Sequence, residues 1–425
     1  MKKDPPPGNK KRSSRIRKVI TGITIALVAL ASLYGALYLL TPYSELARAV
    51  IWMDADIKDY EKFPARTINN APPVFNFEKV DSATQSQYLR MLDGVAASSS
   101  SSQPPSSSSN GTAAAATTTQ TSFNQFLAST QTTDFLIIKD DRLIYENYFN
   151  GYERDSINTS FSVAKSFVSA LVGIAIDEGL IDSVDDPVTK YIPELQDKDS
   201  RYSAITVKHL LSMASGLRYV EEETPFSDDT KTYYDPNLRA VALSAVIEEE
   251  PGRRFHYNNY NYLLLGIILE RATGMSVAKY MEEKLWKPLG MEAPASWSLD
   301  SEANGFEKME SGINARAIDF AKFGRLYLNN GSNWDGEQII SEKWVSTSTS
   351  ANSTSDPSIA YQYGWWIYPL QDGSIDNKRH FSARGNLGQF IYVAPEQGLI
   401  IVRHGYDFGD VNWINLFGII AATAR

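Results

Sequence analysis

The chain has 425 residues, of which 43% are apolar, 21% charged and 12% aromatic, with 26 Gly and 19 Pro. These values are ordinary for a folded protein and exclude a wholly disordered chain, a collagen and a coiled-coil array. Cysteine is absent, which excludes disulfide frameworks, cysteine-ligated zinc, iron–sulfur clusters and thiol nucleophiles. The formal net charge is −9, and the sequence beyond the N-terminus has no basic stripe, so we expect no nucleic-acid partner.

The N-terminus carries a basic segment followed by a long uncharged one. Residues 1–18 hold eight Lys and Arg residues against one Asp, and residues 19–40 contain no charge. About 20 apolar residues span a bilayer core, whereas the apolar part of a cleaved signal peptide usually has about 7–15. Because basic flanks stay in the cytoplasm, the pattern predicts a cytoplasmic tail, one membrane-spanning anchor and an extracytoplasmic remainder. The alternative is a cleaved signal peptide, and Ala47-Arg48-Ala49 resembles a cleavage site.

Two segments separate the anchor from the first clear strand pattern. Residues 41–97 are mixed and interrupted by proline, and we interpret them as a membrane-proximal segment with a short helix at 45–53. Residues 98–121 are rich in Ser, Thr and Ala and carry no charged or aromatic side chain. Such a composition cannot bury enough apolar surface to offset its ordering entropy, so it predicts a flexible linker or surface loop. Residues 122–425 then form one folded domain.

Strand patterns occur at both ends of this domain, with helices between them. β-rich runs at 135–139 and 143–149 are joined through Asp140-Asp141, which is a hairpin signal. Helical patterns follow at 162–179, 207–213, 237–250, 260–273, 277–286 and 315–329. Strand patterns return at 363–368, 380–383, 389–394 and 399–404, before an apolar helix at 413–424. This order predicts an α+β fold whose antiparallel sheet combines N- and C-terminal segments around a helical middle.

Without cysteine, the candidate nucleophiles are serine, threonine, lysine and carboxylates. The four histidines (209, 256, 380 and 404) are isolated, and the sequence has no His-Glu-x-x-His motif. We therefore expect neither a metal site nor a cofactor. The Gly-x-Ser-x-Gly motif of many esterases is also absent from the sequence. The remaining pattern is Ser-x-x-Lys, in which lysine replaces histidine as the base.

Ser-Val-Ala-Lys occurs twice, at 162–165 and at 276–279. On a helix, positions i and i+3 share a face, so Lys165 can reach the Ser162 hydroxyl. Ser162 begins an apolar helix, whose positive N-terminal end favours a developing alkoxide and disfavours a charged ammonium nearby. Ser276 instead follows Thr-Gly and begins a helix with exposed charges, which is typical of an N-cap. The pattern indicates Ser162 as nucleophile and Lys165 as base; the alternative is a capping serine beside a solvated lysine.

A second motif lies in the helical middle, where residues 251–259 read Pro-Gly-Arg-Arg-Phe-His-Tyr-Asn-Asn. Acyl transfer by a Ser-Lys pair needs a second proton carrier for the leaving group and an amide that holds the pair or the substrate. Tyr257 and Asn259 offer these two groups in a Tyr-x-Asn arrangement. The alternative is a buried aromatic corner without a chemical role. The aromatic residues Trp365 and Trp366 are interpreted as packing residues.

Together, these blocks resemble the serine β-lactamase/penicillin-binding-protein superfamily, in its class C β-lactamase-like branch. They are most similar to the 6-aminohexanoate-dimer hydrolase type. The resemblance runs from residue 123 to the C-terminus and includes Ser162-Val-Ala-Lys165, the block at 206–217, Tyr257-x-Asn259 and the block at 383–389. It implies a β-lactamase/transpeptidase-like fold, with an antiparallel sheet and a helical subdomain.

The resemblance also implies a role for each matching residue. Ser162 would attack the substrate carbonyl, with Lys165 as its base. Tyr257 would pass a proton to the leaving group and later activate water, while Asn259 would orient the substrate or Lys165. The oxyanion hole would consist of the backbone N–H groups of Ser162 and of Asn386, the residue after Gly385.

One block departs from the family pattern. β-Lactamases and penicillin-binding proteins carry Lys-Thr-Gly where this sequence has Ala383-Arg384-Gly385. The missing lysine helps to bind the carboxylate of a β-lactam or a stem peptide. Because side chains alternate along a strand, Arg384 replaces it only if its guanidinium turns into the site.

The function expected from these patterns is hydrolysis of a small ester, amide or peptide-like substrate by a membrane-anchored extracytoplasmic serine hydrolase that uses an acyl-enzyme. Two alternatives remain open. One is a D,D-carboxypeptidase or β-lactamase. The other is a binding or sensor domain of the same fold without turnover.

Overall fold

The structure is a computed structural model that describes residues 9–42, 44–100, 122–222, 224, 226–350, 358–368 and 380–424. The chain divides into two compact units, one formed by Met1–Ala55 with Glu221–Pro236 and the other by Asp56–Val220 with Asn237–Arg425. Most of the predicted linker, residues 101–121, lies outside the described residues. Residues 98–100 form the last turn of helix α3 (Ser82–Ser100).

The smaller unit is helical. It contains α1 (Asn9–Leu40), α2 (Glu45–Trp52) and α8 (Asp228–Tyr234). Within α1, Ile16–Leu40 is long and apolar enough to cross a membrane, although a signal sequence would meet the same criterion. Helix α2 corresponds to the short helix predicted at 45–53. It begins after Ser44, whose side chain accepts the N–H of Ala47 at 3.3 Å as an N-cap.

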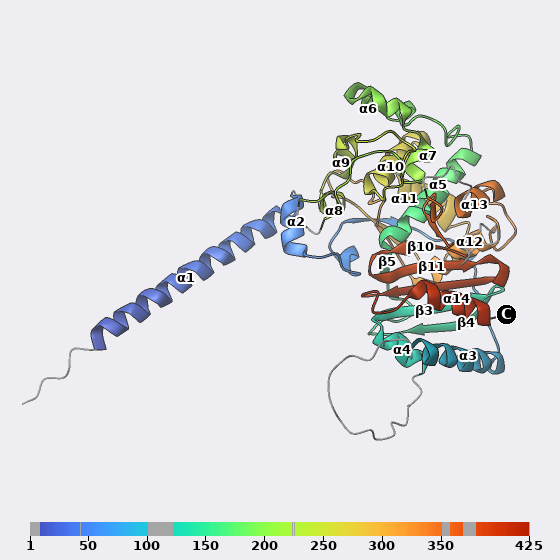
Figure 1. Ribbon diagram of the computed structural model, residues 1–425, viewed down its shortest axis with the longest axis horizontal. Coiled ribbons are helices and arrows are strands. Elements are labelled where there is room, and N and C mark those ends of the chain that lie inside the picture. Colours follow the sequence, from blue (N-terminus) through green and yellow to red (C-terminus); the bar gives the residue numbers. More distant parts are fainter. Residues whose placement is uncertain are drawn as a thin grey trace, which may run out of the picture. The chain divides into compact units, whose positions relative to one another are not determined.

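The larger unit is organised around an eight-stranded sheet (Figure 1). Its strands, in spatial order, are β2 (Glu78–Lys79), β4 (Arg142–Tyr148), β3 (Thr132–Lys139), β12 (Leu399–Gly405), β11 (Gln389–Ala394), β10 (Phe381–Gly385), β9 (Trp365–Ile367) and β8 (Tyr361–Gln362). Strand β3 pairs antiparallel with β12, which joins the N- and C-terminal segments as predicted. Asp140 and Asp141 both have positive φ, at 50° and 60°, the geometry of a two-residue hairpin turn.

Successive side chains along the strands of the sheet belong alternately to two apolar cores, one on each face of the sheet. On β3, Leu136 and Ile138 belong to one core, and Phe135 and Ile137 to the other. The first core is covered by α5 (Ala164–Asp177), α10 (Asn259–Thr273) and α12 (Ala317–Leu328), and the second by α3, α4 (Phe123–Ser129) and α14 (Trp413–Thr423) (Figure 1). Period-two alternation with both faces buried explains why the central strands read as continuous apolar runs.

A smaller four-stranded sheet lies among the helices of the larger unit. Its strands, in spatial order, are β1 (Ala65–Ile68), β6 (Ala295–Ser298), β7 (Ile313–Ala315) and β5 (Asn158–Thr159). The other helices are α6 (Glu194–Lys198), α7 (Val207–Leu211), α9 (Leu238–Ser244), α11 (Val277–Met281) and α13 (Glu342–Thr349). The predicted α+β architecture is confirmed.

Two details of this architecture differ from the sequence-based expectation. The strand predicted at 363–368 is shorter, β9, and it pairs with an additional strand, β8, that precedes the predicted range; Tyr363 and Gly364, with φ of 40° and 87°, form the turn between the two strands. Residues 56–100, which precede the domain expected from residue 122, add β1, β2 and α3 to the same compact unit. Strands of two to four residues in a proline-interrupted stretch offer too few positions for a period of two to be recognised.

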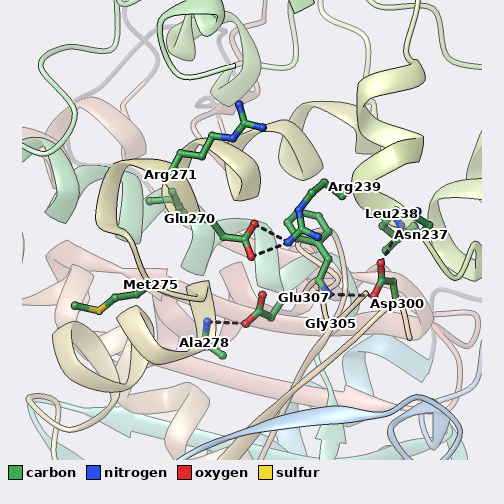
Figure 2. Close-up of polar contacts among 12 residues, drawn as sticks. Asn237, Leu238, Arg239, Glu270, Arg271, Met275, Ala278, Asp300, Gly305 and Glu307 are labelled. Carbon is green, nitrogen blue, oxygen red and sulfur yellow. Dashed lines mark hydrogen bonds and ion pairs between the residues drawn. The ribbon is translucent and has the colours of Figure 1, made fainter. Parts of the chain in front are cut away.

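A partly buried ionic network connects β1 to the helices around it. Arg239 donates two hydrogen bonds to Glu270, at 3.0 and 2.8 Å, and burial raises the pKa of that carboxyl (Figure 2). Glu307 is fully buried, accepts the N–H of Ala278 at 3.2 Å and forms an ion pair with Arg66. The network therefore links β1, the start of α11 and the loop before β7.

Replacing Glu307→Ala is expected to lower the free energy of unfolding by about 2–4 kcal/mol, because Arg66 loses its buried partner and the change leaves a cavity. The effect is smaller than for a fully buried pair, since the Arg66 side chain is 35% exposed and water replaces part of the interaction. Urea unfolding followed by tryptophan fluorescence measures it. Glu302→Ala, at an exposed position nearby, is the control. Equal unfolding free energies for the two variants would contradict a stabilising role for Glu307.

Candidate active site

Ser162 lies in a tight turn that leads into α5. The turn, Phe161–Val163, is a single 3₁₀ turn, and α5 begins at the next residue. Phe161 has φ of 44°, a conformation that a residue with a Cβ rarely adopts and that costs about 1–3 kcal/mol. This strained residue directly precedes Ser162, whose side chain remains half-buried while both of its neighbours are buried. Backbone strain of this kind is concentrated at functional sites.

Lys165 is 1% exposed and lies one turn along from Ser162. Its Nζ donates one hydrogen bond to Ser162 Oγ at 2.8 Å and another to the backbone carbonyl of Glu310 at 3.0 Å. The i,i+3 spacing predicted from the sequence thus places the two side chains in direct contact. A proton can pass between Oγ and Nζ along a hydrogen bond of this length.

The segment that supplies the Glu310 carbonyl is itself held in place. Ser160 Oγ donates to the Ser311 carbonyl at 3.2 Å and accepts the N–H of Ile313 at 3.1 Å. The Glu310 side chain is buried and pairs with buried Lys308 at 3.1 Å. No sequence motif signals this contribution, because the atom that meets Lys165 belongs to the backbone.

The ring of Tyr257 lies beside the Ser-Lys pair. Lys165 Nζ is 4.9 Å from the centre of the Tyr257 ring, within cation–π range. The same ring stacks on Trp366 at 5.9 Å and meets Tyr361 edge-on at 5.9 Å. Burial raises the pKa of Tyr361 well above its usual value, so that phenol stays neutral. The structure therefore brings Ser162, Lys165 and Tyr257 together and adds Trp366, which sequence reasoning had assigned to packing.

Asn259 is the first residue of α10. The preceding residue, Asn258, is the N-cap and accepts the N–H of Tyr260 at 2.9 Å. Asn259 Nδ2 donates to the Tyr219 hydroxyl at 2.8 Å. This contact adds Tyr219 to the polar groups around the predicted amide.

Gly385 ends strand β10 beside the turn that carries Ser162, and Asn386 is the next residue. A Cβ at Gly385 would lie 2.4 Å from the Ser160 carbonyl oxygen and 3.2 Å from the Phe161 Cβ, so only glycine fits there without a shift. Asn386 follows in an exposed turn. The segments of the two predicted oxyanion donors, Ser162 and Asn386, are thus in van der Waals contact.

Arg384 contacts aromatic side chains. Its guanidinium carbon lies 5.2 Å from the Trp366 ring centre and 5.6 Å from that of Phe390. Ala383, the neighbouring residue at the usual lysine position, is fully buried. Trp366 contacts both Arg384 and Tyr257, so the guanidinium belongs to the aromatic surroundings of the site.

The histidines lie apart from the Ser-Lys pair and from one another. Three of them have local partners: His209 with the N–H of Thr206 at 3.1 Å, His380 with Gln397 at 3.0 Å and His404 with Asp134 at 2.7 Å. Burial lowers the pKa of His209 and of His380. Within the described ranges, no group of three or more His, Asp or Glu side chains is arranged to hold a metal ion.

Comparison with known proteins shows which family this chain belongs to. The family model described as Beta-lactamase matches residues 122–405. The chain belongs to the beta-lactamase family. Within this family, the 6-aminohexanoate-dimer hydrolase of Paenarthrobacter ureafaciens is 27% identical over 300 residues, which cover 66% of this chain and 74% of that protein.

Solved structures of the beta-lactamase family share this fold. A candidate 6-aminohexanoate-dimer hydrolase from Bacillus anthracis superposes with a TM-score of 0.68 at 23% identity, covering 90% of this chain and 97% of that one. A class C beta-lactamase from Rhodobacter sphaeroides gives a TM-score of 0.51 at 17% identity, covering 71% and 96%. The predicted superfamily and fold are confirmed, and the protein has the fold of serine hydrolases of the beta-lactamase type.

Replacing Gly385→Ala is expected to lower the free energy of unfolding by about 1–3 kcal/mol, because the new Cβ forces β10 away from the Ser160–Phe161 backbone. Thermal unfolding followed by circular dichroism measures the change. Gly418→Ala is the matched control, since a Cβ there meets nothing within 4 Å and the residue lies in helix α14. Close packing of β10 on the turn is ruled out if the two variants unfold at the same temperature.

Proposed function

We propose that the protein is a serine hydrolase that cleaves ester or short amide bonds through an acyl-enzyme on Ser162. The observation that carries the proposal is the 2.8 Å hydrogen bond between buried Lys165 and the Ser162 hydroxyl. Among the described residues, no carboxylate lies within ion-pair distance of Lys165, so its Nζ faces only the hydroxyl, the Glu310 carbonyl and the rings of Tyr257 and Tyr262.

In the proposed reaction, Ser162 Oγ attacks the substrate carbonyl carbon while its proton passes to Lys165 Nζ. The tetrahedral oxyanion accepts hydrogen bonds from the N–H groups of Ser162 and Asn386. Tyr257 gives a proton to the departing alcohol or amine, the carbonyl re-forms, and the acyl group remains on Oγ. Water then attacks the ester as Tyr257 takes its proton, and Oγ leaves with a proton from Lys165. Asn259 orients the substrate in this scheme.

The surroundings of the site favour esters and amides without a carboxylate over β-lactams and stem peptides. Recognition of a substrate carboxylate by the usual lysine is excluded, because Ala383 occupies that position and is buried. The nearest replacement, Arg384, packs its guanidinium on Trp366 and Phe390. A non-catalytic binding domain would have no need for the hydrogen-bonded Ser-Lys pair.

We also propose that α1 is an uncleaved anchor that holds the enzyme on the extracytoplasmic face of the membrane. No residue of Ile16–Leu40 is buried, and its 25 residues extend about 38 Å at 1.5 Å per residue, enough to cross a bilayer core with tilt. The alternative cleavage site, Ala47-Arg48-Ala49, lies inside helix α2. Arg48 is buried and donates to the Thr41 and Tyr234 carbonyls. Proteases prefer exposed, extended segments, which favours retention of the anchor.

Replacing Ser162→Ala in the detergent-solubilised full chain is expected to reduce p-nitrophenyl butyrate hydrolysis by at least about 10³-fold, because the nucleophile is lost. Intact-mass spectrometry of quenched enzyme should show a butyryl adduct on the wild type and none on the variant.

Ser276→Ala is the matched control, because it removes the serine of the other Ser-Val-Ala-Lys motif. Ser276 caps α11 by accepting the N–H of Lys279 at 3.3 Å, so its loss should reduce stability but not turnover. If Ser162→Ala retains full hydrolysis, or if the folded wild type shows neither turnover nor adduct, the proposed mechanism is wrong for this substrate class.

Replacing Tyr257→Phe is expected to slow release of the acyl group more than its formation when p-nitrophenyl butyrate is the substrate. The p-nitrophenolate leaving group needs no proton, whereas attack by water needs a base, and loss of a general acid–base group costs about 10²–10⁴-fold. Stopped-flow absorbance should then show a burst of p-nitrophenol and a persistent adduct. With the corresponding p-nitroanilide, whose amine needs a proton, the burst should disappear. Equal effects of the variant on the two substrates would argue against a proton-carrying role.

A further inference from the structure

The smaller unit carries an apolar stripe on helix α2. Leu46 and Val50, at positions i and i+4 of α2, are 43% and 47% exposed, and Met53, the residue that follows the helix, is 70% exposed. The spacing places Leu46 and Val50 on one face of the helix, and the two residues after Leu46, Ala47 and Arg48, are buried. An exposed apolar face of this kind on an otherwise ordered helix indicates a surface that is covered in the working protein.

A second piece of chain in the same unit carries an exposed apolar side chain. Arg48 Nη1 donates to the Tyr234 carbonyl at 3.1 Å, and the Tyr234 hydroxyl donates to the Met53 carbonyl at 2.6 Å. The segment Glu221–Pro236, which contains α8, is thus fastened to α2 (Figure 1). It carries Phe226, which at 84% is the most exposed large apolar side chain of the described residues.

The position of α2 along the chain identifies what covers the stripe. Leu40 ends α1, and Arg48 Nε donates to the Thr41 carbonyl at 2.7 Å, which ties α2 to the end of that helix. Leu46 follows Leu40 by six positions, so the two lie at most about 22 Å apart. Tyr34 and Tyr38, each 60% exposed, lie in the last two turns of α1, where aromatic residues mark a membrane–water interface.

We propose that the smaller unit is a membrane-surface module in which Leu46, Val50, Met53 and Phe226 insert into the outer leaflet. The inference rests on the proposed membrane anchor. If α1 spans the bilayer, the stripe begins within the headgroup region, which makes lipid its partner rather than another protein. Carboxylates of Glu45, Glu221 and Glu222 accompany the stripe in this unit, so the contact is apolar and gains nothing from anionic lipid.

The module gives the larger unit a firmer attachment than a single anchor would. The chain passes between the units after Ala55, after Val220 and after Pro236. The larger unit is therefore joined to the membrane-surface module by three chain connections. A single connecting segment would allow the larger unit to move widely relative to the module, whereas three connecting segments restrict that movement.

The absence of cysteine permits a direct test in the full chain. Single variants Leu46→Cys, Val50→Cys, Met53→Cys and Phe226→Cys are spin-labelled and reconstituted in phosphatidylcholine vesicles. Electron paramagnetic resonance then compares collision rates with oxygen, which enters lipid, and with a water-soluble nickel chelate. Val246→Cys and Met275→Cys are matched controls, since both are exposed apolar positions in the larger unit. A spin label at Leu30→Cys shows whether α1 itself lies in lipid or in water.

We expect the oxygen-to-nickel ratio at the four module positions to exceed that of the two controls several-fold, with no increase when phosphatidylglycerol is added. If Leu30 lies in lipid but the module positions match the controls, the inference is overturned and the anchor stands. If Leu30 is in water, the anchor fails and the inference fails with it. Hydrolysis of p-nitrophenyl butyrate by the same labelled proteins reports separately on the proposed activity and on folding.

Discussion

The hydrogen bond between Lys165 and Ser162 requires a buried lysine that has no ion-pair partner among the described residues. Burying an amino group is costly unless other groups replace its water. Here the replacements are the Ser162 hydroxyl, the Glu310 carbonyl and the face of the Tyr257 ring. They come from the turn before α5, from the loop between β6 and β7 and from the segment before α10. The small sheet and the helical middle of the fold therefore meet at this one side chain.

Local patterns were sufficient to predict the parts of this arrangement that lie close together in sequence. The Ser-x-x-Lys contact follows from helical spacing, and the antiparallel sheet follows from long apolar runs at both ends of the domain. The position of Tyr257 beside Lys165 came from the family resemblance, because no local period relates residues so far apart. The Glu310 carbonyl could not be predicted, since a backbone atom leaves no side-chain signature. The strands β1 and β2 could not be predicted either, because two to four residues are too few for a period of two to be recognised.

The aromatic pair Tyr257 and Trp366 contacts two basic side chains. The Tyr257 ring meets Lys165, and the Trp366 ring meets Arg384. The Arg384 guanidinium is attracted by the electron-rich face of the Trp366 ring, and the two rings stack on each other. Arg384 therefore supports Trp366, and Trp366 in turn fixes the ring that faces Lys165. Arg384, which stands where the family usually has threonine, thus acts on the site by packing on Trp366. This role does not require the guanidinium to bind a substrate carboxylate.

The membrane-surface module and the active site are connected by the chain itself. Tyr219, whose hydroxyl accepts a hydrogen bond from Asn259 at the start of α10, is separated from the module segment by Val220 alone. Segment Glu221–Pro236 then returns to the larger unit immediately before α9, which contains Arg239 of the partly buried ionic network. Both ends of the module segment are therefore fixed to ordered parts of the larger unit.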